Sequence, residues 1–342
     1  MTTLPPQTIH PVSESSGIAA VRRAGNLLAH LLGLDENVAG KVALVITEAA
    51  TNILKHAGRG DILLRGLAAD DARGIEVLAI DKGPGFDNLE QAMRDGMSTA
   101  GSYGVGMGAM QRLADEFDLH ADHTNGSALR MAIWGPGHVQ AASEWTVGAV
   151  CLPLPSEEVC GDAWRCAAND GRLLLMVADG LGHGPQAASA SGAATALVQP
   201  GGTFDPAAML QQAHGALQGT RGAAVAVACL DSAADELRFA GIGNISVSLH
   251  GGDNARHLVS HNGIVGSNMR KVQEFTMPLT DDAMLIMHSD GIGTRWDLDR
   301  YPGLSQRHPA LIAAVLYRDH ARGRDDASIV VAQRQPGHGT VR

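Results

Sequence analysis

The spacing of apolar residues changes at about residue 137, and this change constrains the fold more than any other feature of the sequence. Before it, stretches such as residues 16–34 repeat apolar side chains at the spacing of amphipathic helices. After it, most apolar runs are short and bounded by turn-forming residues, which is typical of strands. Residues 135–144, "GPGHVQAASE", have the small, turn-forming composition of a linker. We therefore expect two domains, residues 1–137 and 138–342, each long enough to bury its own core.

The two parts also differ in the elements that they are expected to contain. The first is predicted to combine helices with a few strands, and the second to be rich in strands. The predicted helices are residues 16–34, 36–57, 108–122, 185–198, 206–217 and 309–321. The predicted strands are residues 61–69, 74–81, 127–134, 145–154, 172–179, 222–231, 236–250, 274–279, 283–291 and 327–333. This pattern predicts an α+β protein whose second domain is a sandwich of sheets with helices on its outer faces.

Composition and charge exclude several classes of function. The formal net charge is −10, so the surface is expected to repel nucleic acid. No apolar run approaches the roughly 18 residues of a membrane span, and the first residues show no secretion signal. The four cysteines lack the paired spacing of a zinc site and are too few for a disulfide scaffold. The sequence therefore predicts a reduced, cytoplasmic protein that binds neither nucleic acid nor membranes.

The first candidate for chemistry is the stretch "ITEAATNILKHA", residues 46–57. Glu48 and Asn52 stand four residues apart and therefore share one face of a helix. A carboxylate can accept a proton from an attacking hydroxyl group, and an amide oxygen can ligate Mg²⁺. A surface glutamate and a helix-capping asparagine would give the same pattern.

The second candidate is "DKGPGF", residues 81–86, which follows an apolar strand. Asp81 can accept a hydrogen bond from the exocyclic amine of adenine, while Gly83 and Gly85 would let the backbone approach the base. An ordinary turn explains the same residues.

The third candidate is "YGVGMGAMQRLA", residues 103–114, in which glycines are expected immediately before a helix. Free N–H groups and the helix dipole favour an anion such as phosphate at a helix N-terminus. The glycines of this stretch are Gly104, Gly106 and Gly108.

The order of these three stretches resembles the GHKL ATPase fold over about residues 10–134. Within that family, "TEAATNILKHAGRGDILL", "DKGPGF" and "LADEFDL" are similar to the small serine kinases of bacterial partner-switching modules, of the RsbT and RsbW type. The resemblance implies an N-terminal GHKL α/β sandwich that binds ATP with Mg²⁺ and transfers phosphate to serine or threonine. It also implies a homodimer that forms through the N-terminal domain.

The resemblance assigns a role to each candidate. Glu48 would deprotonate the substrate serine, Asn52 would ligate Mg²⁺, and Asp81 would recognise adenine. Residues 87–103 would form a lid over the nucleotide. Lys55 would help to neutralise phosphate, although a solvated helix lysine explains it equally well.

One position departs from the family pattern. Near the last strand of the domain the family often has Gly-Thr, whose hydroxyl group reaches the adenine site. This chain has "NGSALRM" there, so that Ser127 supplies the hydroxyl group instead.

Acidic residues beside glycine recur through the second part of the chain. Asp162 follows a glycine, while Asp179 and Asp290 each end an apolar run before a glycine. Asp325 and Asp326 open the last strand. Gathering these carboxylates without cations would be costly, because like charges a few ångströms apart raise each other's pKa. Mg²⁺ and Mn²⁺ prefer such oxygen ligands, so the pattern predicts two divalent cations, although each Asp-Gly alone is a common turn.

The same set of acidic residues, in this order, resembles the metal-dependent PPM phosphatases of the SpoIIE and RsbX branch. "RGAAVAVACLDSAADELRFAGIGNISVSL" and "NGIVGSNMRKVQEFTMPL" are similar to RsbX in particular, and the resemblance covers about residues 142–334. It implies a PPM α-β-β-α sandwich.

The resemblance also implies a ligand set. Asp162, Asp179 and the carbonyl group of Gly180 would bind the metal pair, since a side chain at position 180 would crowd the ion and its waters. Asp290 and Asp325 would complete the second ion, with Asp326 outside it, although Asp325 and Asp326 compete for this role because strand neighbours point to opposite faces. His183 is expected to support the loop rather than bind metal.

A kinase and a phosphatase on one chain are useful when both act on the same regulatory circuit. The resemblances therefore imply a bifunctional regulator that phosphorylates and dephosphorylates a STAS-domain antagonist or a stressosome protein. In the alternative, the first domain is a nucleotide-gated module that captures a partner without kinase turnover, joined to an active phosphatase. A phosphatase domain without activity is a third possibility.

Overall fold

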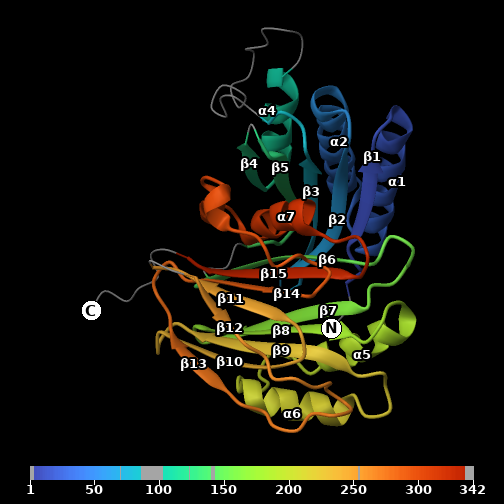
Figure 1. The fold of residues 1–342 in the computed structure, drawn as a ribbon. Helices are drawn as coiled ribbons and strands as arrows, with labels where there is room; N and C mark the ends of the chain where they lie inside the picture. Colours follow the sequence, from blue (N-terminus) through green and yellow to red (C-terminus); the bar gives the residue numbers. More distant parts are fainter. Residues whose placement is uncertain are drawn as a thin grey trace. The chain divides into compact units, whose positions relative to one another are not determined.

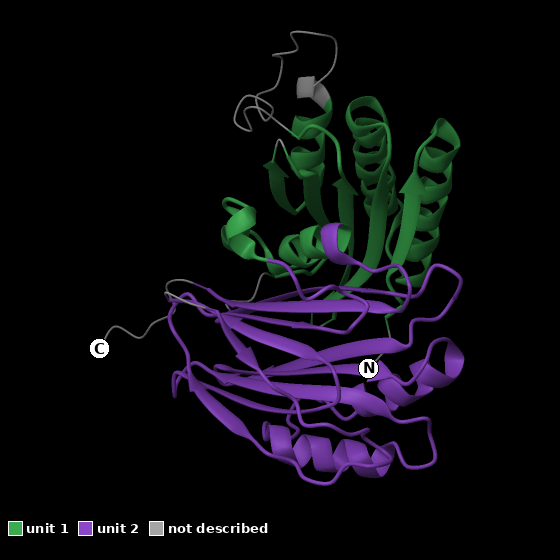
Figure 2. Ribbon diagram, viewed as in Figure 1, with its two compact units in different colours: residues 1–141, 297–318 green, residues 142–296, 319–342 purple. Residues whose placement is uncertain are grey.

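The computed structural model describes residues 4–69, 71–85, 103–122, 124–139, 143–252 and 255–335. The chain divides into two compact units (Figure 2). The first contains residues 1–141 together with residues 297–318, and the second contains residues 142–296 and 319–342. The predicted domain boundary between residues 137 and 138 stays a prediction.

The first unit is built on a five-stranded antiparallel sheet with strand order β1-β2-β3-β5-β4 (Figure 1). Its strands are β1 (Thr8–Val12), β2 (Gly60–Ala69), β3 (Ala72–Asp81), β4 (Glu116–Asp122) and β5 (Gly126–Trp134). The helices α1 (Ser15–Leu31), α2 (Glu36–Asn52) and α4 (Tyr103–Leu113) contribute to one apolar core with the sheet. A single π-helical turn, η1 (Ile53–Ala57), follows α2 directly.

Both faces of this sheet are buried. On β3, alternate residues such as Ile75 and Val77 belong to the core shared with the helices, because side chains of a strand alternate between its faces. The residues between them point to the opposite face, and Glu76 and Leu78 there are each 1% exposed. This second face therefore includes a buried charged residue, Glu76, whereas the second face of many antiparallel sheets is exposed to solvent.

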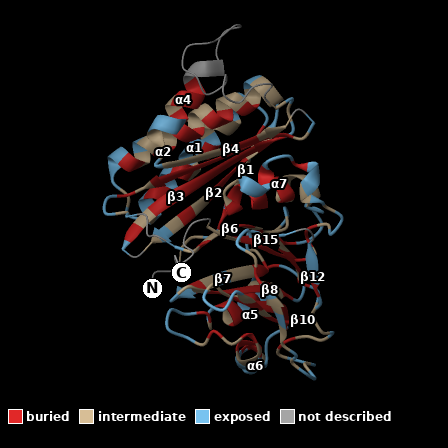
Figure 3. Cartoon of the chain, turned by 90° about the vertical axis from the view of Figure 1, so that its left-hand side faces the viewer, coloured by how far each residue is buried: buried red, intermediate tan, exposed pale blue. Residues whose placement is uncertain are grey.

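The segment 297–318 of the first unit contains the short 3-10 turns η2 (Leu298–Arg300) and η3 (Leu304–Gln306) and most of helix α7 (Pro309–His320). Residues 309–316 of α7 are all buried (Figure 3). A helix that is apolar on every side is buried on every side, in contrast to the amphipathic α1.

The second unit consists of two five-stranded sheets that share an apolar core. One sheet has the order β13-β10-β9-β8-β7 and the other β12-β11-β14-β15-β6. The strands are β6 (Trp145–Leu152), β7 (Asp162–Asn169), β8 (Arg172–Gly180), β9 (Ala223–Asp231), β10 (Glu236–Ile242), β11 (Ser246–His250), β12 (Arg256–Leu258), β13 (Phe275–Pro278), β14 (Met284–His288) and β15 (Ala327–Arg334). Helices α5 (Pro185–Thr195) and α6 (Pro206–Ala216) pack on the outer face of the first of these sheets.

Most predicted elements are present, but two of the predictions are wrong. Residues 108–122 are not a single helix, because α4 ends at Leu113 and residues 116–122 form β4. Phe117, Leu119 and Ala121 alternate toward the core, and pairing with β5 holds this segment extended. Residues 236–250 also form two strands rather than one, while β1 and β7 were not expected.

No helix in the described part of the chain combines the length and hydropathy needed to cross a bilayer.

Candidate functional site

The first unit contains a pocket between its helices and its sheet. Helix α2, the turn after it, β3, the loop that follows β3, α4 and β5 all contribute to its wall. The lining residues are Ala49, Asn52, Ile53, His56, Ala79, Asp81, Pro84, Gly85, Met107, Ser127 and Leu129. An apolar wall with a few convergent polar groups is typical of a small-molecule site.

Asp81 is the polar centre of this pocket. It is the last residue of β3 and is 8% exposed. Its Oδ1 accepts a hydrogen bond of 2.8 Å from the backbone N–H of Gly83, and its Oδ2 accepts one from the hydroxyl group of Ser127 on the neighbouring strand β5. The carboxylate is therefore held in place by two donors, with capacity left to accept a further hydrogen bond from an exocyclic amine.

Glu48 and Asn52 lie beside Gly106 of α4. A Cβ atom at position 106 would be 2.7 Å from Oε2 of Glu48 and 3.6 Å from Oδ1 of Asn52. The structure thus brings three of the predicted residues together, because Glu48 and Asn52 lie one turn apart on the side of α2 that faces α4.

The predicted position of the glycine-rich stretch is wrong. Gly104, Gly106 and Gly108 lie inside α4, which begins at Tyr103. Only the first four N–H groups of a helix are free, so that of Gly108 is not among them. The predicted lid, residues 87–103, lies outside the described residues except for Tyr103.

Of two adjacent residues in η1, the turn after α2, the sequence predicts a site role for Lys55 but not for His56. Lys55 is exposed and does not line the pocket, whereas the adjacent His56 does. Burial and the charge of Lys55 lower the pKa of His56, while Asp81 acts in the opposite direction. The available signal was its spacing, since His56 follows Asn52 by four residues.

The second unit brings its acidic residues to one end of the sandwich. Asp162 at the start of β7 is the cross-strand partner of Asp179 near the end of β8. Asp162 is 5% exposed, and its Oδ2 accepts a hydrogen bond of 2.6 Å from the hydroxyl group of Ser289. Burial raises the pKa of Asp162 to about 7 and that of Asp179 to about 8. The negative charges of Asp325 and Asp326 contribute to both values, and for Asp179 those of Asp162 and Asp290 contribute as well.

Asp290 follows β14 and accepts a hydrogen bond of 2.7 Å from Nδ2 of Asn244. Burial, followed by the charge of Asp325, raises its pKa. No sequence pattern singles out Asn244, whereas Ser289 stands directly before Asp290 in "HSDG".

Asp325 and Asp326 occupy different environments. Asp326 is 2% exposed, and its two oxygens accept hydrogen bonds from the N–H groups of Leu154 and Gly161 at 2.8 and 2.9 Å. Asp325 is exposed and accepts a hydrogen bond from the N–H group of Asp326. The carboxylate of Asp325 is therefore the more available of the two as a ligand.

The donors at this end of the sandwich are carboxylate and carbonyl oxygens, which fits Mg²⁺ or Mn²⁺. Within residues 143–252 and 255–335, no three His, Cys, Asp or Glu side chains lie close enough to enclose one ion. The carboxylates are within electrostatic reach of one another, since the charges of its neighbours raise the pKa of Asp179. A divalent cation between them would remove this repulsion.

The glycines that follow the two strand-end aspartates have a packing role. A Cβ atom at Gly180 would lie 2.2 Å from the carbonyl oxygen of Ala187 in α5, and one at Gly291 would lie 1.9 Å from that of Asp326. Close approach of α5 therefore gives position 180 a packing reason to be glycine, while the predicted crowding of an ion there stays a prediction. His183 forms a hydrogen bond of 2.6 Å with Glu157 through Nδ1.

Comparison with known proteins identifies both parts of the chain. Residues 13–133 match the family model of the histidine kinase-like ATPase domain, and residues 169–335 match that of stage II sporulation protein E (SpoIIE). The chain therefore belongs to the histidine kinase-like ATPase family, in its RsbT branch, and carries a SpoIIE-type phosphatase domain.

Individual relatives agree with this assignment. The serine/threonine-protein kinase RsbT of Bacillus subtilis (strain 168) is 33% identical over 117 residues, which cover 34% of this chain and 88% of RsbT. The phosphoserine phosphatase RsbX of the same strain is 25% identical over 142 residues, which cover 41% of this chain and 71% of RsbX. A structure solved in work on the bacterial stressosome as a modular system for control of secondary messenger signaling has a TM-score of 0.52 at 27% identity. It matches 56% of this chain and 100% of its own.

The predicted family and the two-domain α+β fold are thus confirmed. The chain is an enzyme with a PPM-type serine/threonine phosphatase domain, preceded by a kinase-like ATPase domain similar to RsbT.

Proposed function

We propose that this chain is a bifunctional regulator that both phosphorylates and dephosphorylates a serine or threonine of one STAS-domain partner. The observation that carries the proposal is the presence of two complete sets of candidate residues in one chain. One set, with Glu48, Asn52 and Asp81, lines or adjoins the nucleotide pocket. The other set is the end of the sandwich where Asp162 and Asp179 lie on adjacent strands. Relatives named as a kinase and a phosphoserine phosphatase support each half.

In the kinase domain, the pocket would hold ATP with its adenine against Asp81 and Ser127. Glu48 would accept the proton of the substrate hydroxyl group, and Asn52 would hold Mg²⁺ beside it. The glycines Gly83, Gly85, Gly104 and Gly106 would let the backbone lie close to the nucleotide. Bound Mg²⁺ would neutralise charge on the transferred phosphoryl group.

In the phosphatase domain, Asp162, Asp179, the carbonyl group of Gly180, Asp290 and Asp325 would hold two Mn²⁺ or Mg²⁺ ions. Such a pair orients the phosphate group and supplies hydroxide at neutral pH. Ser289 and Asn244 orient Asp162 and Asp290, while Asp326 ties Leu154 and Gly161 together beneath the site. A homodimer formed through the first domain and a cytoplasmic location complete the proposal.

The test uses the full chain with γ-labelled ATP, Mg²⁺ and a candidate STAS-domain protein, followed by addition of Mn²⁺. The label is expected to appear on the partner in the first step and to leave it in the second. Hydrolysis of p-nitrophenyl phosphate with Mn²⁺ assays the phosphatase half without any partner. Absence of both activities would overturn the proposal.

Glu48→Gln separates the proposal from a nucleotide-gated capture module. The substitution is expected to abolish phosphorylation of the partner while ADP binding and partner capture remain. Asp71→Asn, at an exposed position between β2 and β3, serves as the control. If wild type binds ADP and the partner but never transfers phosphate, the capture module is the better description.

A further inference from the structure

Residues 297–318 lie between β14 and β15 in the sequence, within the region that matches the SpoIIE family. They nevertheless pack with the first unit, the one that holds the nucleotide pocket (Figure 2). A piece of the phosphatase sequence is therefore part of the kinase unit.

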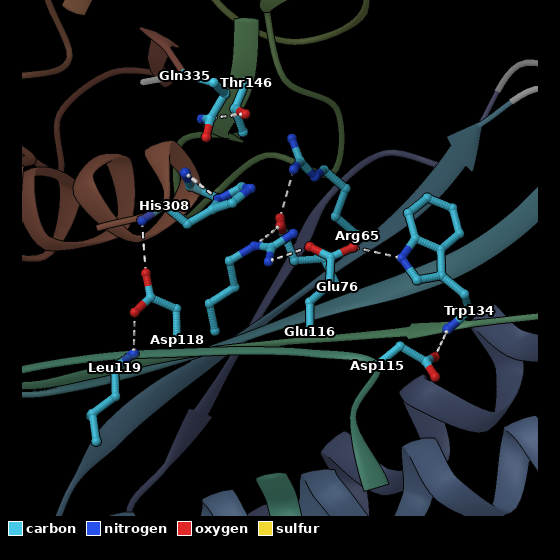
Figure 4. A network of polar contacts seen from close by, with 12 residues as sticks. Arg65, Glu76, Asp115, Glu116, Asp118, Leu119, Trp134, Thr146, His308 and Gln335 are labelled. Carbon is cyan, nitrogen blue, oxygen red and sulfur yellow. Dashed lines mark hydrogen bonds and ion pairs between the residues drawn. The ribbon is translucent and has the colours of Figure 1, made fainter. Parts of the chain in front are cut away.

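The start of α7 is fastened to β4. The N–H group of His308 donates a hydrogen bond of 2.7 Å to Oδ2 of Asp118, and Nη1 of Arg307 lies 3.4 Å from Oδ1 of the same carboxylate. Figure 4 shows Asp118 between Leu119 and His308. These contacts hold the N-terminal end of α7 against β4 of the sheet.

The other end of α7 contacts the main chain of two residues that line the nucleotide pocket. Nη1 of Arg318 donates hydrogen bonds of 3.0 Å to the carbonyl oxygen of Asp81 and 3.2 Å to that of Ser127. These are the two residues whose side chains bond to each other in the pocket wall. One charged group therefore holds the main chain of β3 and β5 together where the pocket needs both, and hydrogen bonds from a charged donor are the stronger kind.

The chain beyond Arg318 leads directly to the carboxylate site of the second unit. The carbonyl oxygen of His320 accepts a hydrogen bond of 2.8 Å from the N–H group of Gly293, and the N–H group of Arg322 donates one of 2.8 Å to Gly291. Gly291 follows Asp290, and Asp325 stands seven residues after Arg318. Arg318 is therefore joined to one proposed metal ligand, Asp325, by seven residues of chain, and the same stretch is hydrogen-bonded to the two glycines that follow the other, Asp290.

We propose that Arg318 is a positioning residue for the nucleotide pocket, and that residues 318–325 make adenine binding in the first unit and divalent cation binding in the second mutually dependent. The inference rests on the proposed function, because it uses the same two sites. Coupling between two binding sites is reciprocal, so each ligand changes the affinity for the other by the same factor. We expect that factor to be at least roughly fivefold.

The first experiment measures adenosine binding to the full-length protein by calorimetry, without metal. Adenosine carries no phosphate and so brings no cation with it. Arg318→Ala is expected to weaken adenosine binding roughly tenfold. Arg318→Lys should recover part of this loss, because an ammonium group can still donate to one carbonyl. Arg23→Ala, at an exposed arginine of α1, should bind as wild type does.

The second experiment measures Mn²⁺ binding to Asn52→Ala protein with and without saturating adenosine. This background removes the metal ligand of the nucleotide site, so the observed Mn²⁺ binds in the second unit. The dissociation constant for Mn²⁺ should change at least roughly fivefold with adenosine, and Arg318→Ala should abolish that change.

The outcomes separate the two proposals. If wild type binds neither adenosine nor Mn²⁺, the proposed function fails. If wild type binds both but each affinity is independent of the other ligand, the function stands and the coupling is overturned. If Arg318→Ala is folded by circular dichroism and binds adenosine like wild type, the positioning role is overturned. Should Arg318→Ala not fold, Arg318→Lys and the reciprocal measurements on wild type decide the question.

Discussion

Both units contain buried carboxylates, but the charges that surround these carboxylates are opposite in sign. In the first unit Glu76 is 1% exposed, and burial alone would raise its pKa. Nη2 of Arg65 lies 2.6 Å from one of its oxygens and Nε of Arg130 lies 2.8 Å from the other (Figure 4). The two guanidinium groups outweigh burial, and the pKa of Glu76 falls to about 2.

In the second unit Asp162 and Asp179 are also shielded from solvent, but their charged neighbours are other carboxylates. Burial and those neighbours act in the same direction and raise their pKa values to about 7 and 8. The first unit thus supplies positive charge from its own arginines, whereas in the second unit the proposed divalent cations would supply it. This contrast distinguishes a structural ion network from the carboxylates of the proposed metal site.

The largest expected effect tests the structural side of the comparison. Glu76→Gln leaves two arginines without their shared counter-charge, and Arg130 is only 5% exposed. The free energy of unfolding of the first unit should fall by about 3–5 kcal/mol, as when one partner of a buried ion pair is removed. Urea denaturation followed by circular dichroism measures it, with Asp71→Asn as the control. A loss below about 1 kcal/mol would mean that the network is solvated and the contrast is weak.

Asp179→Asn tests the metal-binding side. Hydrolysis of p-nitrophenyl phosphate with Mn²⁺ should fall more than about 100-fold, because a proposed ligand of both ions is lost. In EDTA, however, the variant should be as stable as wild type or more so, since a repelling charge has been removed. Glu158→Gln, at an exposed position before Asp162, is the matched control. Activity within a few-fold of wild type would contradict the assignment.

Substitutions of Asp325 and Asp326 test which of these two residues is a metal ligand. Asp325→Asn should weaken Mn²⁺ binding by roughly tenfold, because this exposed carboxylate is the available one. Asp326→Asn should instead lower stability, because Asp326 joins Leu154 and Gly161 through their N–H groups. Calorimetric titration with Mn²⁺ and urea denaturation of both variants give the two readouts. The reverse pattern would exchange the proposed roles of the two residues.

Much of this architecture follows from short-range sequence patterns. Asp81, Asp179 and Asp290 can be found from sequence because each comes at or near the end of an apolar strand. Glu48 and Asn52 are found because helical spacing places them on one face. Each of these signals needs only a few neighbouring residues.

The remaining features depend on contacts between distant residues. Ser289 and Asn244 are ordinary polar residues until the fold brings them to Asp162 and Asp290. Residues 116–122 have a locally helical neighbourhood, and only the pairing with β5 makes them a strand. The membership of residues 297–318 in the first unit has no local signal at all, since it rests on Arg318 and His308 meeting strands about 190 residues away in sequence.

The smallest expected effect is the change in the free energy of unfolding per pH unit that comes from the titration of Asp162 and Asp179. The folded protein holds protons on Asp162 and Asp179 up to about pH 7 and 8, whereas the unfolded chain releases them near pH 4. Raising the pH through this window therefore lowers the free energy of unfolding of the metal-free protein. Removing one of the carboxylates in Asp179→Asn should reduce that slope by roughly 1 kcal/mol per pH unit.

Comparing wild type with Asp179→Asn in EDTA isolates the contribution of Asp179 to this slope. Both proteins contain the first unit, in which Glu76 changes the pH dependence of stability in the opposite direction, so its contribution cancels in the comparison. The lowered pKa of Glu76 adds stability that is lost only in acid, as the pH falls below about 4.5 toward 2. Saturating Mn²⁺ should remove the difference in slope for wild type, since the cation keeps the carboxylates ionised. If the two proteins show the same slope without metal, other groups of the protein already stabilise the ionised aspartates. The second unit would then offset its buried carboxylates as the first unit offsets Glu76.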